Sequence, residues 1–167
     1  HSYFQETKKI ILVRHGKSAW NNPNLTDHDR LLAARGLDDV PEMGFRLMEK
    51  GIFPDLIISS TAIRASQTAA LLAEVLHLPK SKLTYDKNLY HASASMILKT
   101  IQRQDDSNEL IFVVGHNPGM NDFIDFFGGN LDNLPTSGQY GWLADTDHWL
   151  QLRPENSRTW FIDYPKK

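Results

Sequence analysis

The chain has 167 residues, a length that suits one domain with at most a small addition. It contains no cysteine, which excludes disulfides, thiolate metal sites and every cysteine-nucleophile mechanism. Its 18 basic and 20 acidic residues give a net charge of −2, a poor electrostatic basis for binding nucleic acid or an anionic membrane, and we expect neither partner.

The chain begins with His1 rather than Met, so a processed form stays open. We assign residues 1–8 to an N-terminal extension or remnant and residues 9–167 to a single domain. The absence of cysteine fits the cytoplasm and the periplasm equally, and we expect a cytoplasmic protein without a membrane span.

The first half of the chain alternates between strand and helix patterns. Residues 10–13 form a β-branched apolar run, which predicts a strand buried on both faces. Apolar residues then recur at helical spacing from Leu37 to Met48, with Pro41 expected in the first turn and Gly51 ending the helix. A second buried strand is predicted over 55–59, and a helix over 62–77 follows it.

The second half continues this alternation and then changes. We expect a short strand over 83–85, a helix around 97–101, a third buried strand over 110–114 and a helix over 120–127. Residues 140–144 and 158–163 are expected to pair as an edge hairpin. The predicted fold is an α/β three-layer sandwich: a mostly parallel central sheet, helices on both faces and an antiparallel C-terminal edge hairpin.

Charged and imidazole side chains follow each of the three strong strands. Arg14 and His15 come after the first, Arg64 after the second and His116 after the third. Ligands of such sheets bind beyond the carboxyl ends of the strands, so these residues are expected to converge. Two guanidinium groups suit phosphate, and an imidazole beside them can act as nucleophile, acid or base.

The ordered motifs resemble those of the histidine phosphatase superfamily, which includes cofactor-dependent phosphoglycerate mutases and many phosphatases. The resemblance is carried by Arg14-His15-Gly16, by Arg64 with the Gln67-Thr68 pair after it, and by Gly115-His116. Five stretches are most similar to the SixA-type phosphohistidine phosphatases: residues 14–20, 29–36, 59–68, 115–119 and 135–136. This resemblance implies a phosphatase that needs no metal or other cofactor and forms a phosphohistidine on the enzyme.

The resemblance also implies a role for individual residues. His15 would be the nucleophile, with its other ring nitrogen donating to a backbone carbonyl, and His116 would be a protonated second imidazole. Arg14 and Arg64 would bind the phosphate oxygens. Four residues would support phosphate or substrate binding around them: Arg30, Gly16, Ser18 and Asn22.

The general acid is the point at which this sequence departs from the family. Mutases and many phosphatases carry a glutamate after the second helix, but residues 85–91 contain none, and Asn88 lies near the expected place. Asp86 and His91 are the candidate substitutes. A missing acid disfavours alkyl phosphates, whose leaving group needs a proton, and favours phosphohistidine, whose imidazole leaves readily once solvent protonates it.

Several readings stay open beside phosphohistidine on a protein such as a histidine phosphotransfer domain. One alternative is a phosphatase for a small phosphorylated metabolite or a phospho-Ser/Thr protein. Another, of a different class, is a non-catalytic phosphate-binding regulatory module, although such a module has no need of a nucleophile. The run Asp27-His28-Asp29 has no second ligand cluster at a matching spacing, so we interpret it as a polar loop rather than a metal site.

Overall fold

The computed structural model describes residues 7–167. Residues 1–6 of the expected N-terminal extension lie outside the described part. Strand β1 (Lys8–Arg14) begins at Lys8, whose side chain is buried, so the strand starts inside the segment that was expected to precede the domain.

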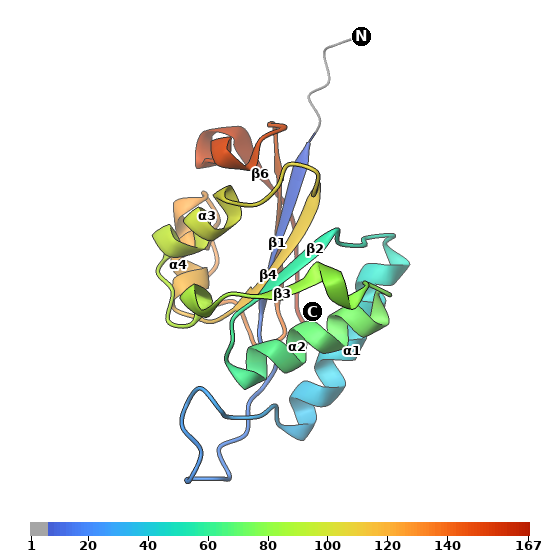
Figure 1. The fold of residues 1–167 in the computed structure, drawn as a ribbon, viewed down its shortest axis with the longest axis vertical. Coiled ribbons are helices and arrows are strands. Elements are labelled where there is room, and N and C mark those ends of the chain that lie inside the picture. Colours follow the sequence, from blue (N-terminus) through green and yellow to red (C-terminus); the bar gives the residue numbers. More distant parts are fainter. Residues whose placement is uncertain (1–6) are drawn as a thin grey trace.

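A single six-stranded sheet forms the middle of the molecule, in the order β3-β2-β4-β1-β5-β6 (Figure 1). Besides β1, its strands are β2 (Leu56–Ser59), β3 (Leu83–Tyr85), β4 (Leu110–Gly115), β5 (Gln139–Ala144) and β6 (Ser157–Asp163). The first four in this order pair in parallel, whereas β5 pairs antiparallel to β1 and β6 antiparallel to β5. The prediction of a mostly parallel sheet with an antiparallel C-terminal hairpin is confirmed.

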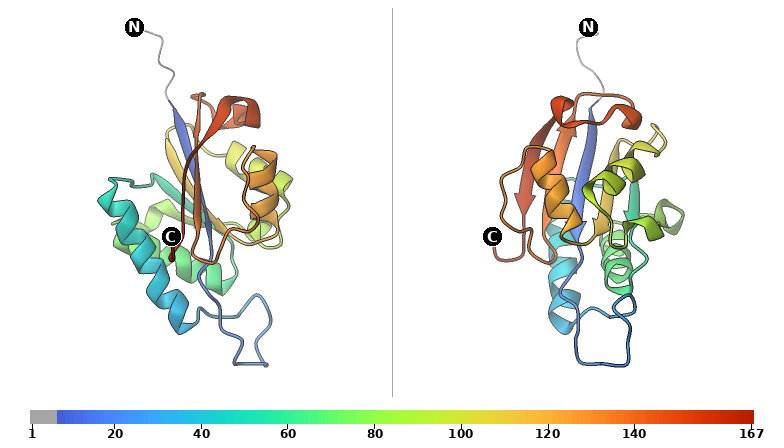
Figure 2. Two further views of the ribbon diagram at one scale, coloured as in Figure 1. Left: turned by 180° about the vertical axis from the view of Figure 1, so that it is seen from behind. Right: turned by 90° about the vertical axis from the view of Figure 1, so that its left-hand side faces the viewer.

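Two pairs of helices cover the two faces of this sheet (Figure 2). Helices α1 (Ala34–Glu49) and α2 (Ile63–Val75) lie on one face, and α3 (Ala94–Gln102) and α4 (Gly119–Phe126) lie on the other. Side chains of a strand point alternately to the two faces, so Ile10 and Leu12 join one buried cluster and Ile11 and Val13 the other. Within residues 7–167, none of the helices has the length and apolarity that crossing a membrane requires.

Helix α1 corrects the prediction for Pro41. The helix begins at Ala34 rather than near Leu37, so Pro41 lies inside it and not in the first turn. Proline has no N–H, and the carbonyl of Leu37 therefore lacks its usual helical partner. The helical spacing of apolar residues could not reveal the earlier start. Residues 34–36 have no large apolar side chain, and Gly36 contributes a backbone contact instead.

That glycine fixes the start of α1 against the loop after β1. A Cβ on Gly36 would lie 2.5 Å from the carbonyl oxygen of Lys17, and a Cβ on Gly16 would lie 3.2 Å from the Cα of Gly36 and 2.8 Å from Val40 Cγ2. The backbone of the helix thus lies directly on the backbone that follows His15. This contact fixes the position of the loop that carries the candidate nucleophile.

Candidate active site

The carboxyl ends of β1, β2 and β4 meet at the lower end of the sheet in Figure 1, where the predicted site residues converge. The rings of His15 and His116 have centroids 5.1 Å apart and are tilted by 52°. Arg14, Arg64 and Arg30 all lie close enough to His15 to affect its charge. The topology therefore brings together the five residues on which the predicted chemistry depends.

His15 is buried and has a defined tautomer. Its Nδ1 lies 2.7 Å from the carbonyl oxygen of Gly16, which can only accept, so Nδ1 carries the proton and Nε2 keeps its lone pair. Burial lowers the pKa of His15 to about 4; the Gly16 hydrogen bond opposes this shift, and the positive charges of the nearby arginines add to it. At neutral pH the ring is uncharged and Nε2 is available as a nucleophile.

Arg14 and Arg64 are each held by a backbone carbonyl, and each has one buried nitrogen without a hydrogen-bond partner among the described residues. Arg14 Nη1 donates to the carbonyl oxygen of Leu134 at 2.9 Å, and Arg64 Nη1 donates to that of Asp27 at 2.6 Å. Thr68 Oγ1 accepts from Gly16 N and donates to the carbonyl of Arg64, which joins the start of α2 to the loop after His15. The Nε atoms of both arginines are buried and unpartnered.

His116 is held through one ring nitrogen. Its Nε2 lies 2.8 Å from Ser60 Oγ, while its Nδ1 is buried and has no hydrogen-bond partner within residues 7–167. Burial, helped by His15 and the charge of Arg64, lowers the pKa of His116 to about 3. Burial thus favours the neutral ring, whereas the negative charge of Asp27 opposes this shift, and the protonated His116 stays a prediction for the site with a phosphoryl group bound.

Three residues near the candidate nucleophile thus have a buried nitrogen without a partner in the described part of the chain: Arg14 Nε, Arg64 Nε and His116 Nδ1. Buried polar atoms rarely stay unpaired, because each lost hydrogen bond costs free energy. An oxyanion between the histidines and the arginines could accept hydrogen bonds from both guanidinium groups and from a proton on His116. The charge and the donor set fit phosphate.

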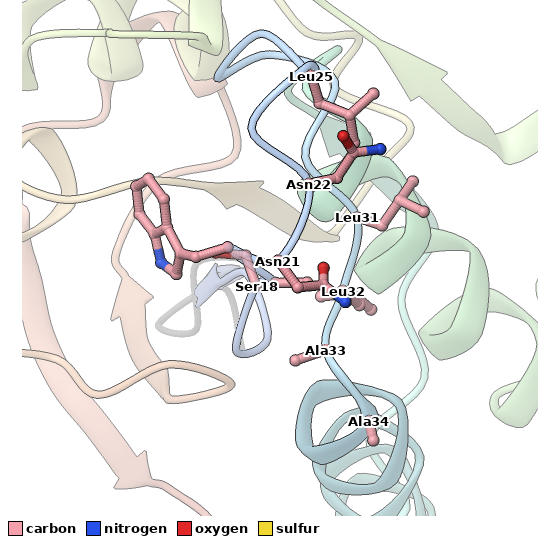
Figure 3. A pocket seen from close by; sticks show the side chains of 10 residues that line it. Ser18, Asn21, Asn22, Leu25, Leu31, Leu32, Ala33 and Ala34 are labelled. Carbon is pink, nitrogen blue, oxygen red and sulfur yellow. The ribbon is translucent and has the colours of Figure 1, made fainter.

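Arg30 lies at the edge of this site. Its Nη1 donates to Ser18 Oγ, and its guanidinium lies 3.6 Å from the centroid of the Trp20 ring. A cavity of about 620 Å³ opens beside this pair and is lined by Ser18, Trp20, Leu25, Leu31 and neighbouring residues of the loop between β1 and α1 (Figure 3). Ser18 therefore orients Arg30 and borders the cavity at the same time.

Gly16 has a different role from the predicted one, whereas Asn22 lines the cavity. The N–H of Gly16 donates to Thr68 Oγ1 at 3.0 Å, so it is not free to bind phosphate, and Gly16 instead permits the close contact with α1. Asn22 is exposed, and its Oδ1 accepts from the N–H of Asn24 on the wall of the cavity in Figure 3. A glycine or asparagine in a motif does not reveal which partner its polar atoms will have.

The two candidate acids lie in different surroundings. Asp86 accepts from the N–H of Asn88 at 2.8 Å and pairs with Arg103 at 3.7 Å. Its carboxylate therefore caps the short turn at residues 87–89. His91 stacks on Tyr90 with 3.9 Å between ring centroids and lines a cavity of about 330 Å³ together with His116. The structure favours His91 over Asp86 as a proton donor near the site.

Asp27 is the residue that the sequence analysis missed. Its Oδ1 accepts from Arg30 Nε and Nη2 at 3.2 and 3.0 Å, and its Oδ2 accepts from Arg64 Nη2 at 3.1 Å and from the Tyr90 hydroxyl at 2.6 Å. These bonds, first the one from Tyr90 and then those from the arginines, hold the pKa of Asp27 well below its ordinary value. The spacing of Asp27 and Arg30 could have indicated one of these pairs.

In the described part of the chain, no three His, Cys, Asp or Glu residues gather as metal ligands would.

The two buried histidines should make stability depend on pH. In the unfolded chain a histidine binds a proton near pH 6.5, whereas His15 and His116 in the fold do so only near pH 4 and 3. Between these values the unfolded state binds more protons, so stability falls as the pH is lowered from 6.5, by about 1.4 kcal/mol per pH unit for each histidine. Urea unfolding between pH 6.5 and 4.5 should show a shallower fall in His15→Ala, and equal slopes would contradict the burial of a neutral His15.

Fold and site together define an α/β protein of the phosphatase or mutase type, with paired histidines and arginines at the carboxyl edge of the sheet. A sequence profile of the histidine phosphatase superfamily (branch 1) matches residues 10–93. The chain belongs to this superfamily.

Individual relatives agree with this assignment. An uncharacterised chloroplast protein of Arabidopsis thaliana is 28% identical over 140 residues, which are 78% of this chain and 63% of the relative. Phosphoglycerate mutase 1 of Saccharomyces cerevisiae is 41% identical over 68 residues, 40% of this chain and 28% of the mutase. The chain thus spans less than two thirds of the length of these curated relatives.

A solved structure shows the same fold over nearly the whole chain. The SixA protein of Agrobacterium tumefaciens, a candidate phosphohistidine phosphatase, is 26% identical, with a TM-score of 0.79 over 95% of this chain and 99% of that one. The expected resemblance to SixA-type proteins is confirmed for the fold.

Proposed function

We propose that this protein is a metal-independent phosphatase that forms a phosphohistidine at His15 and removes phosphate from phosphohistidine on a protein. The observation that carries the proposal is the set of three unpartnered buried nitrogens around His15, on Arg14, Arg64 and His116. Phosphoryl oxygens could accept hydrogen bonds from these atoms, and the neutral His15 near the two arginines could attack the phosphorus. A pure binding module would need the anion site but not a nucleophile.

The first step transfers the phosphoryl group to the enzyme. Nε2 of His15 attacks the phosphorus, a new N–P bond forms, and the N–P bond to the substrate imidazole breaks. The leaving imidazole takes its proton from solvent. Arg14, Arg64 and Arg30 balance the charge on the phosphoryl oxygens, and His116 donates through Nδ1 when that nitrogen holds a proton.

The second step returns the free enzyme. Water attacks the phosphorus on His15, the N–P bond to Nε2 breaks, and inorganic phosphate leaves with the oxygen of the water. The proton stays on Nδ1, which donates to the Gly16 carbonyl oxygen throughout, so His15 ends in the tautomer in which it began.

The surroundings of residues 85–91 support phosphohistidine as the substrate. Asp86 is engaged in a turn and with Arg103, and the exposed Asn88 carries no acidic group. Without a strong general acid, an alkoxide leaves slowly, whereas a protonated imidazole leaves readily. The fold shared with the SixA protein of Agrobacterium tumefaciens supports the same substrate class, and a histidine phosphotransfer domain is the proposed partner.

The test compares phosphate release from a phosphohistidine peptide and from an alkyl phosphate, side by side. We expect kcat/KM to be at least about 10²-fold higher for the peptide, because general acids contribute about 10²–10⁴-fold and the alkyl substrate needs one. His15→Ala is the control for contaminating phosphatases. Equal or better activity on the alkyl phosphate would contradict the proposed substrate and direct attention to His91.

The cavity beside Arg30 favours a second candidate, a phosphatase for a small phosphorylated molecule. Its volume of about 620 Å³ lies within the range of small-molecule sites, and it borders Ser18 and Trp20 (Figure 3). His91 would then have to protonate the leaving group. His91→Ala would lower activity on the alkyl phosphate much more than on the phosphohistidine peptide if this candidate were right.

A further inference from the structure

An anion from the chain itself already binds two of the arginines assigned to phosphate. The carboxylate of Asp27 accepts three hydrogen bonds from guanidinium groups, two from Arg30 and one from Arg64, and a fourth from the Tyr90 hydroxyl. The two arginines come from different parts of the fold, since Arg30 lies in the loop after β1 and Arg64 in the first turn of α2. Asp27 therefore joins the loop to the helix at the edge of the anion site.

We infer that Asp27 is a resident anion, which binds Arg64 and Arg30 and competes with phosphate for them. The inference rests on the proposed function and adds a means of product release. When phosphate binds, it must share these guanidinium groups with the negative charge of Asp27 or displace that charge toward solvent. When the reaction ends, the carboxylate again holds Arg64 Nη2 together with Arg30 Nε and Nη2, which weakens the hold of these two guanidinium groups on inorganic phosphate.

Asp27 holds Arg64 through two groups, an exposed side-chain carboxylate that can move and a backbone carbonyl that stays in place. The side chain of Asp27 is 44% exposed, whereas that of Arg64 is 6% exposed. Arg64 Nη1 also binds the backbone carbonyl of Asp27 at 2.6 Å. The carboxylate can turn toward solvent while the backbone bond keeps Arg64 in place, so Arg64 can exchange one anion for another without leaving the site.

Competition with phosphate and a purely structural role for Asp27 predict opposite changes in phosphate affinity when its carboxylate is lost. If the carboxylate only positions the arginines, its loss disorders them and weakens phosphate binding. If it competes with phosphate, the loss of its charge strengthens phosphate binding, because repulsion and competition both disappear. The sign of the change in phosphate affinity therefore distinguishes the two roles.

The experiment measures the binding of inorganic phosphate by titration calorimetry and its inhibition of turnover. Asp27→Asn keeps the shape and the acceptor oxygen but removes the charge, and we expect the Kd for phosphate to fall about tenfold, or about 1.4 kcal/mol. Asp29→Asn is the matched control: Asp29 is exposed in the same loop, pairs with His28 at 3.2 Å, and should leave the Kd unchanged. Added inorganic phosphate should therefore lower the turnover rate of Asp27→Asn more than that of the parent.

A second variant covers the case in which Asp27→Asn fails to fold. Tyr90→Phe removes one donor to Asp27 Oδ2 and loosens the carboxylate, so phosphate affinity should rise less than in Asp27→Asn but in the same direction. Unchanged or weaker phosphate binding in these variants overturns the inference and leaves the proposed phosphatase intact. A parent protein that fails to bind phosphate at millimolar concentration overturns both.

Discussion

Replacing His15 by alanine should abolish turnover and leave the fold intact. The substitution removes the only atom proposed to attack phosphorus, Nε2, whereas the arginines and the sheet stay in place. Loss of a nucleophile costs several orders of magnitude, so we expect kcat to fall by at least about 10³-fold. The side chain ends in the anion site rather than in either apolar cluster, so the substitution should not disrupt the core.

The measurement is phosphate release from a phosphohistidine peptide, with circular dichroism and thermal unfolding as the check on the fold. The parent should also form an acid-labile phosphoenzyme that the variant lacks. A folded variant within about tenfold of the parent rate would contradict covalent catalysis at His15.

Replacing Arg64 by lysine should lower kcat nearly as much as removing a hydrogen-bond donor to the transition state. Lysine keeps the charge, but it lacks the planar fork in which one nitrogen binds the Asp27 carbonyl while the others keep a fixed direction toward phosphate. Removing one such donor typically lowers kcat by about 10²–10³-fold, and we expect a loss of this size. Competition by vanadate, which binds as a phosphate analogue, should weaken in parallel.

Arg35→Lys is the matched control for this variant. Arg35 is exposed and, among residues 7–167, pairs only with Asp39 one helical turn away, at 3.3 Å. Its replacement should therefore change neither turnover nor vanadate inhibition. A similar loss in both variants would mean that overall positive charge, rather than the geometry of Arg64, determines the activity.

The sequence was sufficient for the fold because each buried strand is an unbroken apolar run. The apolar side chains of three runs can all be buried only in a sheet that is covered on both faces: residues 10–13, 55–59 and 110–114. The helices between these runs must therefore lie on the two faces of the sheet. The start of α1 was missed because its contact with the loop after β1 depends on the absence of side chains at Gly16 and Gly36. Apolar periodicity carries no information about such a backbone contact.

The site was predictable to the same extent as the topology. His15, Arg64 and His116 converge because parallel strands end at one edge of the sheet, and their places after the strands can be read from the sequence. The neutral state of His116 follows from burial, which appears only in the folded chain. The bonds of Asp27 to Arg64 and Tyr90 join residues far apart in the chain, and no local pattern indicates them.

The contact between Gly16 and Gly36 limits how the activity of this protein can be altered. Side chains at an interface can change rotamer to absorb a substitution, but two backbones in contact cannot. The loop after β1 and the start of α1 must therefore change together, which makes single substitutions within residues 14–17 a poor route to new substrates. The exposed loop around Asn22 and Leu25 has no such restriction, so selection for a different substrate should act there first.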